Sequence, residues 1–468
     1  MFFIHKGLKE IIRSTKQLFS YELLNQIDRD TGFITRKGKM DAATFLSFNS
    51  FLSEDMCEQS LATLSSRLSS YYNISLSPQA LNERFNDNAV EYMKEAFNTL
   101  MLKQNKILNR KFYFKRIVIN DSTVFNLSER FSSEFKAVGG NASKFSIKIQ
   151  LQYDLLSGTF MCCEPMSGAI NDGSYIDTMD KNTENGDLRL ADLGYYKTGY
   201  LKNIHEKGAF YVSKIKSTTP IYKKNSTPKR TKRGEIIKSS EYIRLDALDL
   251  IKPLADGETI EIKDIYIGSK KELKSRLIIT KLSQENKQKI DSKNKEVLRR
   301  EKRQLNDRNS AWTALNAYIT NIPEEILSKD QVHEIYSLRW QVEIMFKVWK
   351  SIFKISNTKN NKKIKIQRFK CFLYGRLISI LFSAGIISIA KDIIHNENFD
   401  DDTKEISNLK AFDQVKEFLP NLRTKIFEDE MSILILMNAI IDTLRRFSMK
   451  SVRKGDKSVR KLLGYIAA

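Results

Sequence analysis

The sequence predicts a mixed α/β core with a helical region on either side of it. Three patterns support this fold class. Apolar residues recur at helical spacing up to about Lys111 and again from Ile366 onward. The segment Phe145–Tyr153 alternates apolar and polar residues with the period of two that is typical of a strand. A largely apolar helix, expected from Ser328 to Lys354, follows the last predicted strand.

The first region, residues 1–111, is expected to be a helical DNA-binding domain. Leu61, Leu64, Leu68 and Tyr71 are spaced for one helix face, and a second helix is expected to open at Ser77-Pro78. Two short helices joined by a turn fit a helix-turn-helix. They fit a plain helical bundle equally well, so the pattern leaves both open.

Residues 112–216 are predicted to hold the first part of the core. A short apolar run, Ile117–Ile119, ends at Asp121, and a break at Gly139-Gly140 precedes the alternating segment. Further strands are expected at Thr159–Glu164, Leu188–Asp192 and Ala209–Ile215, with a helix at Thr198–Lys207.

The remaining boundaries follow from changes in composition. Residues 217–310 are expected to form a β-rich insertion, with the basic run Lys223–Arg233, a strand at Thr259–Ile267 and a charged helix at Gln284–Asn306. Residues 311–365 are expected to complete the core with a strand at Ala317–Thr320 and the helix from Ser328 to Lys354. Residues 366–468 should form a C-terminal helical domain.

The charge of the chain points to a polyanionic partner. Lys and Arg number 78 against 56 Asp and Glu, which gives a net charge of +22. Nucleic acid is the first partner to expect, since no basic amphipathic membrane anchor stands out. The four cysteines lack zinc-ligand spacing, and the start of the chain lacks a secretory pattern, so a cytoplasmic protein is expected. Cys371–Ala390 has the length of a membrane span, but Arg376 near its middle favours a buried helix.

The helix expected from Ser328 to Lys354 concentrates polar residues on one stripe. Ser328 and Gln331 have capping-box spacing. At 3.6 residues per turn, a continuous helix places the polar side chains Tyr336, Arg339, Glu343, Lys347 and Lys350 together, on an otherwise apolar helix. Surface ion pairs would explain the spacing alone. A carboxylate among cations that can grip phosphate oxygens, on a helix this apolar, favours phosphodiester chemistry.

This segment resembles a known family. Tyr336-x2-Arg339-x3-Glu343-x6-Lys350 is similar to the Y-x2-R-x3-E-x6-K signature of one branch of the DDE transposases of bacterial insertion sequences, and the similarity can be followed from about Ile117 to Ile389. The resemblance implies a ribonuclease-H-like core with a β-rich insertion. It also implies that Asp121, after the first core strand, and Asp192, after the fourth, are the other two acids. Asp154 and Asp172 lie beside glycine-containing turns and are not selected.

The family resemblance implies cut-and-paste transposition. Asp121, Asp192 and Glu343 are then the catalytic metal ligands for two Mg²⁺ or Mn²⁺ ions, which activate a water or 3'-hydroxyl and stabilise the leaving oxygen. The element end is expected to be nicked, closed into a hairpin, reopened and joined to target DNA. The implied partners are the inverted-repeat ends and target DNA, bound by a homodimer at the bacterial nucleoid, with no membrane.

Several residues are expected to contact DNA. Tyr336, Arg339 and Lys350 would hold phosphates by resemblance, Lys347 by its place on the helix, and Trp312 would receive a flipped base. The run Lys223–Arg233 is expected either to contact the DNA backbone or to be a solvated basic loop. Two other functions remain open at this point: a regulatory relative that binds element ends without cutting, and a ribonuclease-H-like repair nuclease without end specificity.

Overall fold

The computed structural model describes residues 6–36, 38–52, 58–104, 112–127, 129–131, 134–137, 145–301, 312, 314–355, 364–397, 403–453 and 457–466. Two compact units divide the chain: unit 1 comprises Met1–Asn109, Ser122–Ile170 and Trp340–Ser458, and unit 2 comprises Arg110–Asp121, Asn171–Arg339 and Val459–Ala468. The predicted break at Gly139-Gly140 and the end of the charged helix at Asn306 lie outside the described residues.

Unit 1 begins with a series of helices whose ends are marked by capping side chains. They are α1 (Lys6–Leu18), α2 (Tyr21–Thr31), α3 (Ala42–Phe51), α4 (Leu61–Tyr72), α5 (Pro78–Arg84) and α6 (Asp87–Leu102). Ser60 caps α4, Ser77 caps α5, and Asn73 ends α4 in the left-handed conformation at φ 55°. The predicted helix pair at 61–84 is therefore present. Its predicted apolar face is wrong at Tyr71, which is 45% exposed and lies under the Arg423 guanidinium instead of in the core.

The core of unit 1 is built around the long helix α14 (Ile366–Glu397). Phe382 contacts Phe19 and Phe51 on this helix's apolar surface, and Gly375 lets the backbone of α3 approach closely at Asn49. A 30-residue stretch of α14 has the length and apolar composition of a membrane span, and 72% of its most apolar window is buried. Burial to this extent fits a core helix, as the position of Arg376 predicts.

Further elements complete unit 1. They are the end of β1 (Arg116–Asn126), the antiparallel pair β2 (Ser146–Asp154) and β3 (Thr159–Ser167), α13 (Trp340–Lys347), the π-helical turn η5 (Val348–Ile352), α15 (Asn408–Lys425) and α16 (Glu430–Phe447). The C-terminal region was expected to be wholly helical. It also contains a short antiparallel pair, β11 (Lys404–Ile406) with β12 (Met449–Ser451).

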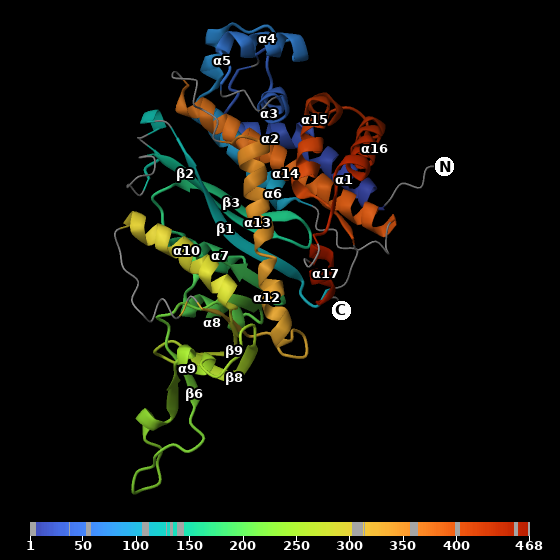
Figure 1. Cartoon of the computed structure of the whole chain (residues 1–468). Coiled ribbons are helices and arrows are strands. Elements are labelled where there is room, and N and C mark those ends of the chain that lie inside the picture. Colours follow the sequence, from blue (N-terminus) through green and yellow to red (C-terminus); the bar gives the residue numbers. More distant parts are fainter. Residues whose placement is uncertain are drawn as a thin grey trace. The chain divides into compact units, whose positions relative to one another are not determined.

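Unit 2 is organised around a sheet with the strand order β1-β4-β5-β10-β9-β8-β6-β7, whose strands β1, β6, β8 and β9 are labelled in Figure 1. The strands after β1 are β4 (Asp187–Ala191), β5 (Phe210–Lys214), β6 (Ile221–Lys224), β7 (Tyr242–Leu245), β8 (Thr259–Ile267), β9 (Leu273–Lys281) and β10 (Leu315–Thr320). Strands β1, β4 and β5 are parallel, whereas β10 runs antiparallel to β5 and to β9. The strands of the predicted insertion therefore continue the same sheet through the β9–β10 pair.

The helices of unit 2 are α7 (Ile176–Lys181), α8 (Thr198–Glu206), α9 (Ala247–Ile251), α10 (Gln284–Glu301), α12 (Lys329–Ser337) and α17 (Val459–Gly464). The last of these belongs to a C-terminal segment that returns to unit 2, where Ile466 O accepts a hydrogen bond from Tyr113 N at 2.8 Å. Along the chain, β1, β2, β3, β4, α8, β5, the insertion, β10 and α12 follow one another in the order that the sequence predicts. Helix α7, between β3 and β4, has no counterpart among the elements predicted from the sequence pattern.

Candidate active site

The parallel strands β1 and β4 are held in register by a buried ion pair. Arg116 faces Asp187 at the start of both strands, and its guanidinium makes two bonds to that carboxylate, at 2.6 and 2.7 Å. Arg116 is 8% exposed and Asp187 is fully buried. Such a bidentate pair favours this register, because a slip by one residue would separate two buried opposite charges.

This register brings Asp121 and Asp192 to neighbouring positions. The last paired residues of the two strands are Asn120 and Ala191, and the two aspartates are the residues that follow. The backbones of adjacent strands lie about 4.8 Å apart. Asp121 and Asp192 are therefore close neighbours, where the pairing of β1 with β4 ends. Strand β1 continues five residues beyond Asp121, to Asn126, so the prediction that the strand ends at Asp121 is wrong. The β-branched residues Thr123 and Val124 favour the extended conformation that continues there.

Asp192 is exposed and is not used as a helix cap. It occupies the N-cap position of the short 3-10 helix η3 (Leu193–Tyr195), yet its side chain makes no capping hydrogen bond. By contrast, Asp154, one of the acids not selected, caps the β2–β3 turn by accepting a bond from Leu156 N at 3.2 Å. The two aspartates thus differ in structural role, since only Asp154 is used to close a turn.

The end of α12 adds a cation and a hydroxyl to the same edge of unit 2. Arg339 Nη1 donates to Asp121 Oδ2 at 3.0 Å, and both side chains are largely buried, at 10% and 18% exposure. Tyr336 Oη donates to the backbone oxygen of Ala191, the residue before Asp192, at 3.1 Å. The two signature residues Tyr336 and Arg339 are therefore brought beside both aspartates.

The charged groups around Tyr336 and Lys214 act on the pKa values of both side chains. Burial raises the pKa of Tyr336 to about 12; Arg339 opposes this shift, whereas Asp192 and Asp121 add to it. Tyr336 is therefore a neutral hydrogen-bond donor at physiological pH. Burial lowers the pKa of Lys214, while the nearby Asp192 raises it and Arg339 lowers it further.

Lys214 is a site residue that sequence reasoning missed. It ends β5, the strand next to β4, and its ammonium lies 5.9 Å from the centre of the Tyr336 ring. The available signal was a lysine at the carboxyl end of a parallel strand that neighbours the Asp192 strand. Asn120 was missed as well: it is 1% exposed, and neither atom of its side-chain amide has a hydrogen-bond partner among the described residues.

The predicted catalytic helix is not continuous. Leu338 N and Arg339 N bond three residues back, to Ile335 O and Tyr336 O, so α12 closes in a tightened turn before α13 begins. The last turn is π-helical from Val348 to Ile352 and contains Lys350. The single polar stripe, which assumed 3.6 residues per turn throughout, is therefore wrong as a geometric description. The capping box at Ser328 and Gln331 is confirmed.

The remaining signature residues lie in unit 1. Glu343 is half-buried on α13, and Lys347 is exposed on the same helix. Lys350 is exposed, with its ammonium 5.6 Å from the centre of the Phe125 ring. The apolar residues of the segment are buried as predicted, including Val342, Phe346 and Trp349. Trp312 is half-buried and lies three residues before β10.

The donor set at the strand ends suits a hard divalent cation, since carboxylate oxygens are the ligands that Mg²⁺ and Mn²⁺ prefer. Within the part of the chain that the structure describes, no three His, Cys, Asp or Glu side chains are gathered closely enough to hold a metal ion. Asp121 and Asp192 carry oxygen atoms of the type that such a cation prefers.

A family model and two relatives of known name agree on one family. Residues 112–382 match the family model described as a transposase DDE domain. The transposase for insertion sequence element IS1151 of Clostridium perfringens is 46% identical, over 99% of this chain and 98% of the relative. The transposase for IS231F of Bacillus thuringiensis subsp. israelensis is 32% identical, over 99% and 96%. Among solved structures, a piggyBac transposase synaptic complex with hairpin DNA aligns over 96% of this chain and 87% of that one, with 10% identity and a TM-score of 0.47.

Proposed function

Since this chain belongs to the DDE transposases of bacterial insertion sequences, enzymes that cleave and transfer DNA, we propose that Asp121, Asp192 and Glu343 are its catalytic carboxylates. The observation that carries the proposal is the pairing of β1 with β4, which sends Asp121 and Asp192 out of neighbouring strands. Glu343 follows Arg339, the partner of Asp121, by four residues in the chain. It is the third acid that the signature supplies.

The three carboxylates would hold two Mg²⁺ or Mn²⁺ ions. Such a pair, when bound, lowers the pKa of an attacking water or 3'-hydroxyl and stabilises charge on the leaving oxygen. The protein's own contribution is orientation and charge. Arg339 holds the Asp121 side chain in place, and the neutral Tyr336 hydroxyl, bonded to Ala191 O, fixes the backbone that precedes Asp192.

The cations around the carboxylates would bind the DNA phosphates. Lys214 lies beside Asp192 within unit 2, and Lys347 and Lys350 are exposed on the helical segment that carries Glu343. Each cation that contacts a phosphate releases a counterion and so contributes to salt-dependent binding. We propose that these groups hold the element end while it is nicked, closed into a hairpin, reopened and joined to target DNA, with two protomers holding two ends.

Substitution of the three carboxylates by amides tests this site. Asp121→Asn, Asp192→Asn and Glu343→Gln should each lower metal-dependent cleavage of a labelled element end by at least about a hundredfold. Substituting a residue that only supports a metal ligand can already cost about a hundredfold in activity, and loss of the ligand itself should cost at least as much. Binding of the same DNA in EDTA should remain. Asp172→Asn is the matched control, because Asp172 lies in unit 2 beside a turn and should leave cleavage unchanged.

Two results would contradict the assignment. Full cleavage by any one amide variant, with an unchanged unfolding midpoint, would remove that residue from the site. If the unaltered protein binds element ends but does not cut them in Mg²⁺ or Mn²⁺, the chain would be a regulatory relative rather than an active transposase.

A further inference from the structure

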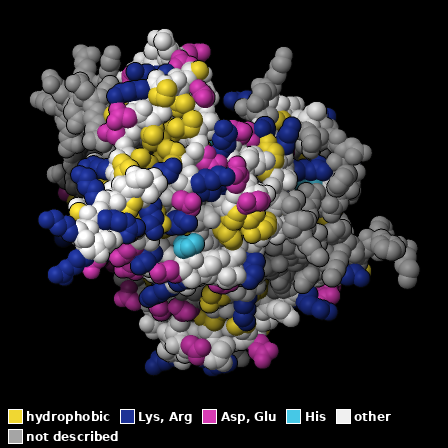
Figure 2. All heavy atoms as spheres, turned by 90° about the horizontal axis from the view of Figure 1, so that it is seen from below, with side chains coloured by type: hydrophobic (Ala, Val, Ile, Leu, Met, Phe, Trp, Pro, Cys, Tyr) yellow, Lys and Arg dark blue, Asp and Glu magenta, His cyan; other side chains and the backbone are white. Residues whose placement is uncertain are grey.

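Unit 2 carries a strongly basic arm, defined here as residues 223–244. It consists of the second half of β6, most of β7 and the long loop that joins them, which extends away from β8 and β9 (Figure 1). The arm contains two acids, Glu235 and Glu241, and eight cations: Lys223, Lys224, Lys229, Arg230, Lys232, Arg233, Lys238 and Arg244. On the face of the molecule shown in Figure 2, Lys and Arg side chains are interspersed with Asp and Glu. The arm differs in that its cations far outnumber its acids.

The arm is ordered although it buries almost no apolar surface. Backbone hydrogen bonds join its two sides, from Asn225 N to Glu241 O at 2.8 Å and from Ile237 N to Lys229 O at 2.8 Å. Arg230 Nη1 donates to Gly234 O at 2.7 Å and closes the tip. The sequence alone left this segment open between a DNA contact and a solvated loop. A built hairpin costs less entropy on binding than a flexible loop, so it favours the contact.

The cations of the arm are not neutralised within the molecule. All eight side chains that carry them are exposed, and within the described part of the chain none forms an ion pair with a carboxylate. Elsewhere in unit 2, surface lysines such as Lys252, Lys263 and Lys274 are paired with acids. Unpaired like charges held close together repel one another, and a polyanion removes that cost.

The arm also exposes branched apolar side chains beside its cations. Ile236 is 41% exposed, Ile237 is 37% exposed, and Ile243 on β7 is 51% exposed. Ile236 and Ile237 are consecutive and lie next to the tip. A β-arm that presents cations together with an apolar wedge has the chemistry of proteins that enter the DNA minor groove, where the cations bind phosphates and the wedge opens a base step.

The strand order sets where such a contact would fall. Six strand-to-strand steps separate β1 from β6 in the order β1-β4-β5-β10-β9-β8-β6. At about 4.8 Å per step this is roughly 29 Å. That distance corresponds to roughly nine base pairs of duplex at about 3.4 Å each. A duplex that runs across the strands from Asp121 would therefore meet the arm about nine base pairs away.

We propose that the arm is a second DNA-binding element, which lies against duplex DNA about one helical turn from the cleavage position. Lys229, Lys232 and Arg233 bind phosphates, and Ile236 and Ile237 press into a minor-groove base step and bend the duplex. The proposal rests on duplex DNA being the partner of this transposase. It does not depend on the assignment of the carboxylate site, because it is tested without metal.

The phosphate contacts are tested by the salt dependence of binding in EDTA. For an end-labelled mixed-sequence duplex, the triple variant Lys229→Ala, Lys232→Ala, Arg233→Ala should lower the slope of log affinity against log salt by up to about 3. Arg230 is kept because it closes the tip. The control variant Lys252→Ala, Lys263→Ala, Lys274→Ala removes the same charge from the same unit and should leave the slope unchanged. Equal slopes in the two variants would overturn the phosphate contacts.

The wedge is tested by DNA bending, measured as energy transfer between dyes at the two ends of the duplex. The double variant Ile236→Ala, Ile237→Ala should straighten the bound duplex while its salt slope stays that of the unaltered protein. Ile170→Ala, which truncates an isoleucine of similar exposure in unit 1, should leave bending unchanged. A bend that survives in the double variant would overturn the wedge.

A variant with a shortened arm tests whether misfolding, rather than loss of DNA contacts, explains a change in salt slope or in bending. Replacing residues 226–239 by Asn-Gly joins Asn225 to Ser240, which already lie side by side through the bond from Asn225 Nδ2 to Ser240 O at 2.8 Å. The trimmed protein should keep its unfolding midpoint and show both losses, in slope and in bending. If it binds and bends DNA as the unaltered protein does, the arm is not a DNA-binding element.

Discussion

The Arg339 guanidinium joins two segments that lie 218 residues apart in the chain, because it bonds the Asp121 carboxylate. Both side chains are largely buried, so each would be costly to leave without the other. This contact gives Arg339 a positioning role at a proposed catalytic carboxylate, in addition to the phosphate contact that the signature predicts for it.

A double-mutant cycle on Arg339→Ala and Asp121→Asn should measure this coupling. We expect a coupling energy of about 1–3 kcal/mol in urea unfolding without divalent metal, since partly desolvated charged hydrogen bonds contribute in that range. The exposed pair Lys263–Glu324 in the same unit is the control, and its coupling should be clearly weaker because water screens both charges. If the buried pair couples no more strongly than the exposed one, Arg339 does not hold Asp121 in solution.

The sequence predicted that Tyr336, Arg339 and Asp121 belong to the candidate site, but it did not predict the contacts between them. Spacing along a helix shows which side chains share a face, so Tyr336 and Arg339 were found together. It cannot show that Arg339 reaches Asp121 or that Tyr336 reaches Ala191, because both contacts join distant segments. Lys214 was missed for the same reason: a lysine at a strand end has no pattern of its own until the neighbouring strand is known.

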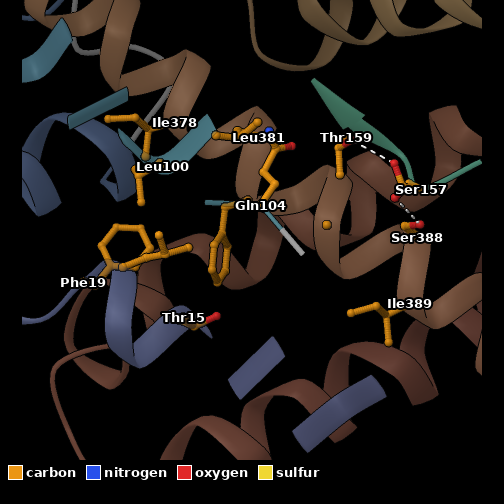
Figure 3. Close-up of a pocket in the computed structure, with 13 residues that line it drawn as sticks. Thr15, Phe19, Leu100, Gln104, Ser157, Thr159, Ile378, Leu381, Ser388 and Ile389 are labelled. Carbon is orange, nitrogen blue, oxygen red and sulfur yellow. Dashed lines mark hydrogen bonds between the residues drawn. The ribbon is translucent and has the colours of Figure 1, made fainter. Parts of the chain in front are cut away.

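At the scale of an element, α14 carries two glycines in opposite surroundings. A Cβ added to Gly375 would meet Asn49 O at 2.4 Å, so this glycine permits the close approach of α3. A Cβ added to Gly385 would meet nothing within 4 Å. Gly385 lines a cavity of about 70 Å³ in unit 1, bordered by Phe19, Leu100 and Ile389 among others (Figure 3).

These surroundings predict opposite effects for the same substitution. Gly385→Ala should raise the free energy of unfolding by about 1 kcal/mol, because alanine favours the helix and its methyl group fills empty space. Gly375→Ala should lower it by about 1–3 kcal/mol, because the helix must move away from Asn49. Urea unfolding of the two variants checks both. The packing of α14 would be described wrongly if Gly375→Ala were neutral or Gly385→Ala destabilising.

Some helices and strands were predicted more accurately than others, and the differences have physical reasons. Strands with clear alternation, such as Thr259–Ile267, agree with the structure to the residue. The segment from Ser328 to Lys354 was expected to be one helix, because its apolar residues keep helical spacing through the break at Leu338 and Arg339. A 3-10 turn and a π turn change the hydrogen-bonding partner by one residue, and such a change leaves little trace in sequence periodicity.

At the scale of the whole molecule, the net charge of +22 acts on stability and on binding in opposite directions. Folding gathers the cations and increases their mutual repulsion, so the free protein is stabilised when salt screens them. DNA binding is weakened by the same salt, because releasing counterions into a more concentrated salt solution gains less free energy. The basic arm contributes to both effects, since its cations are unpaired within the described residues.

Thermal unfolding in EDTA should therefore respond to salt with opposite sign in the free and bound protein. Without DNA, the unfolding midpoint should rise as NaCl is added at low ionic strength. With duplex at about 100 times its dissociation constant, the native state gains about 2.7 kcal/mol, and this gain should shrink as salt is added. The arm-trimmed protein, which loses five cations and one acid, should show a smaller salt response in both series. A free-protein midpoint that falls with NaCl would mean that like-charge repulsion does not limit the stability of this fold.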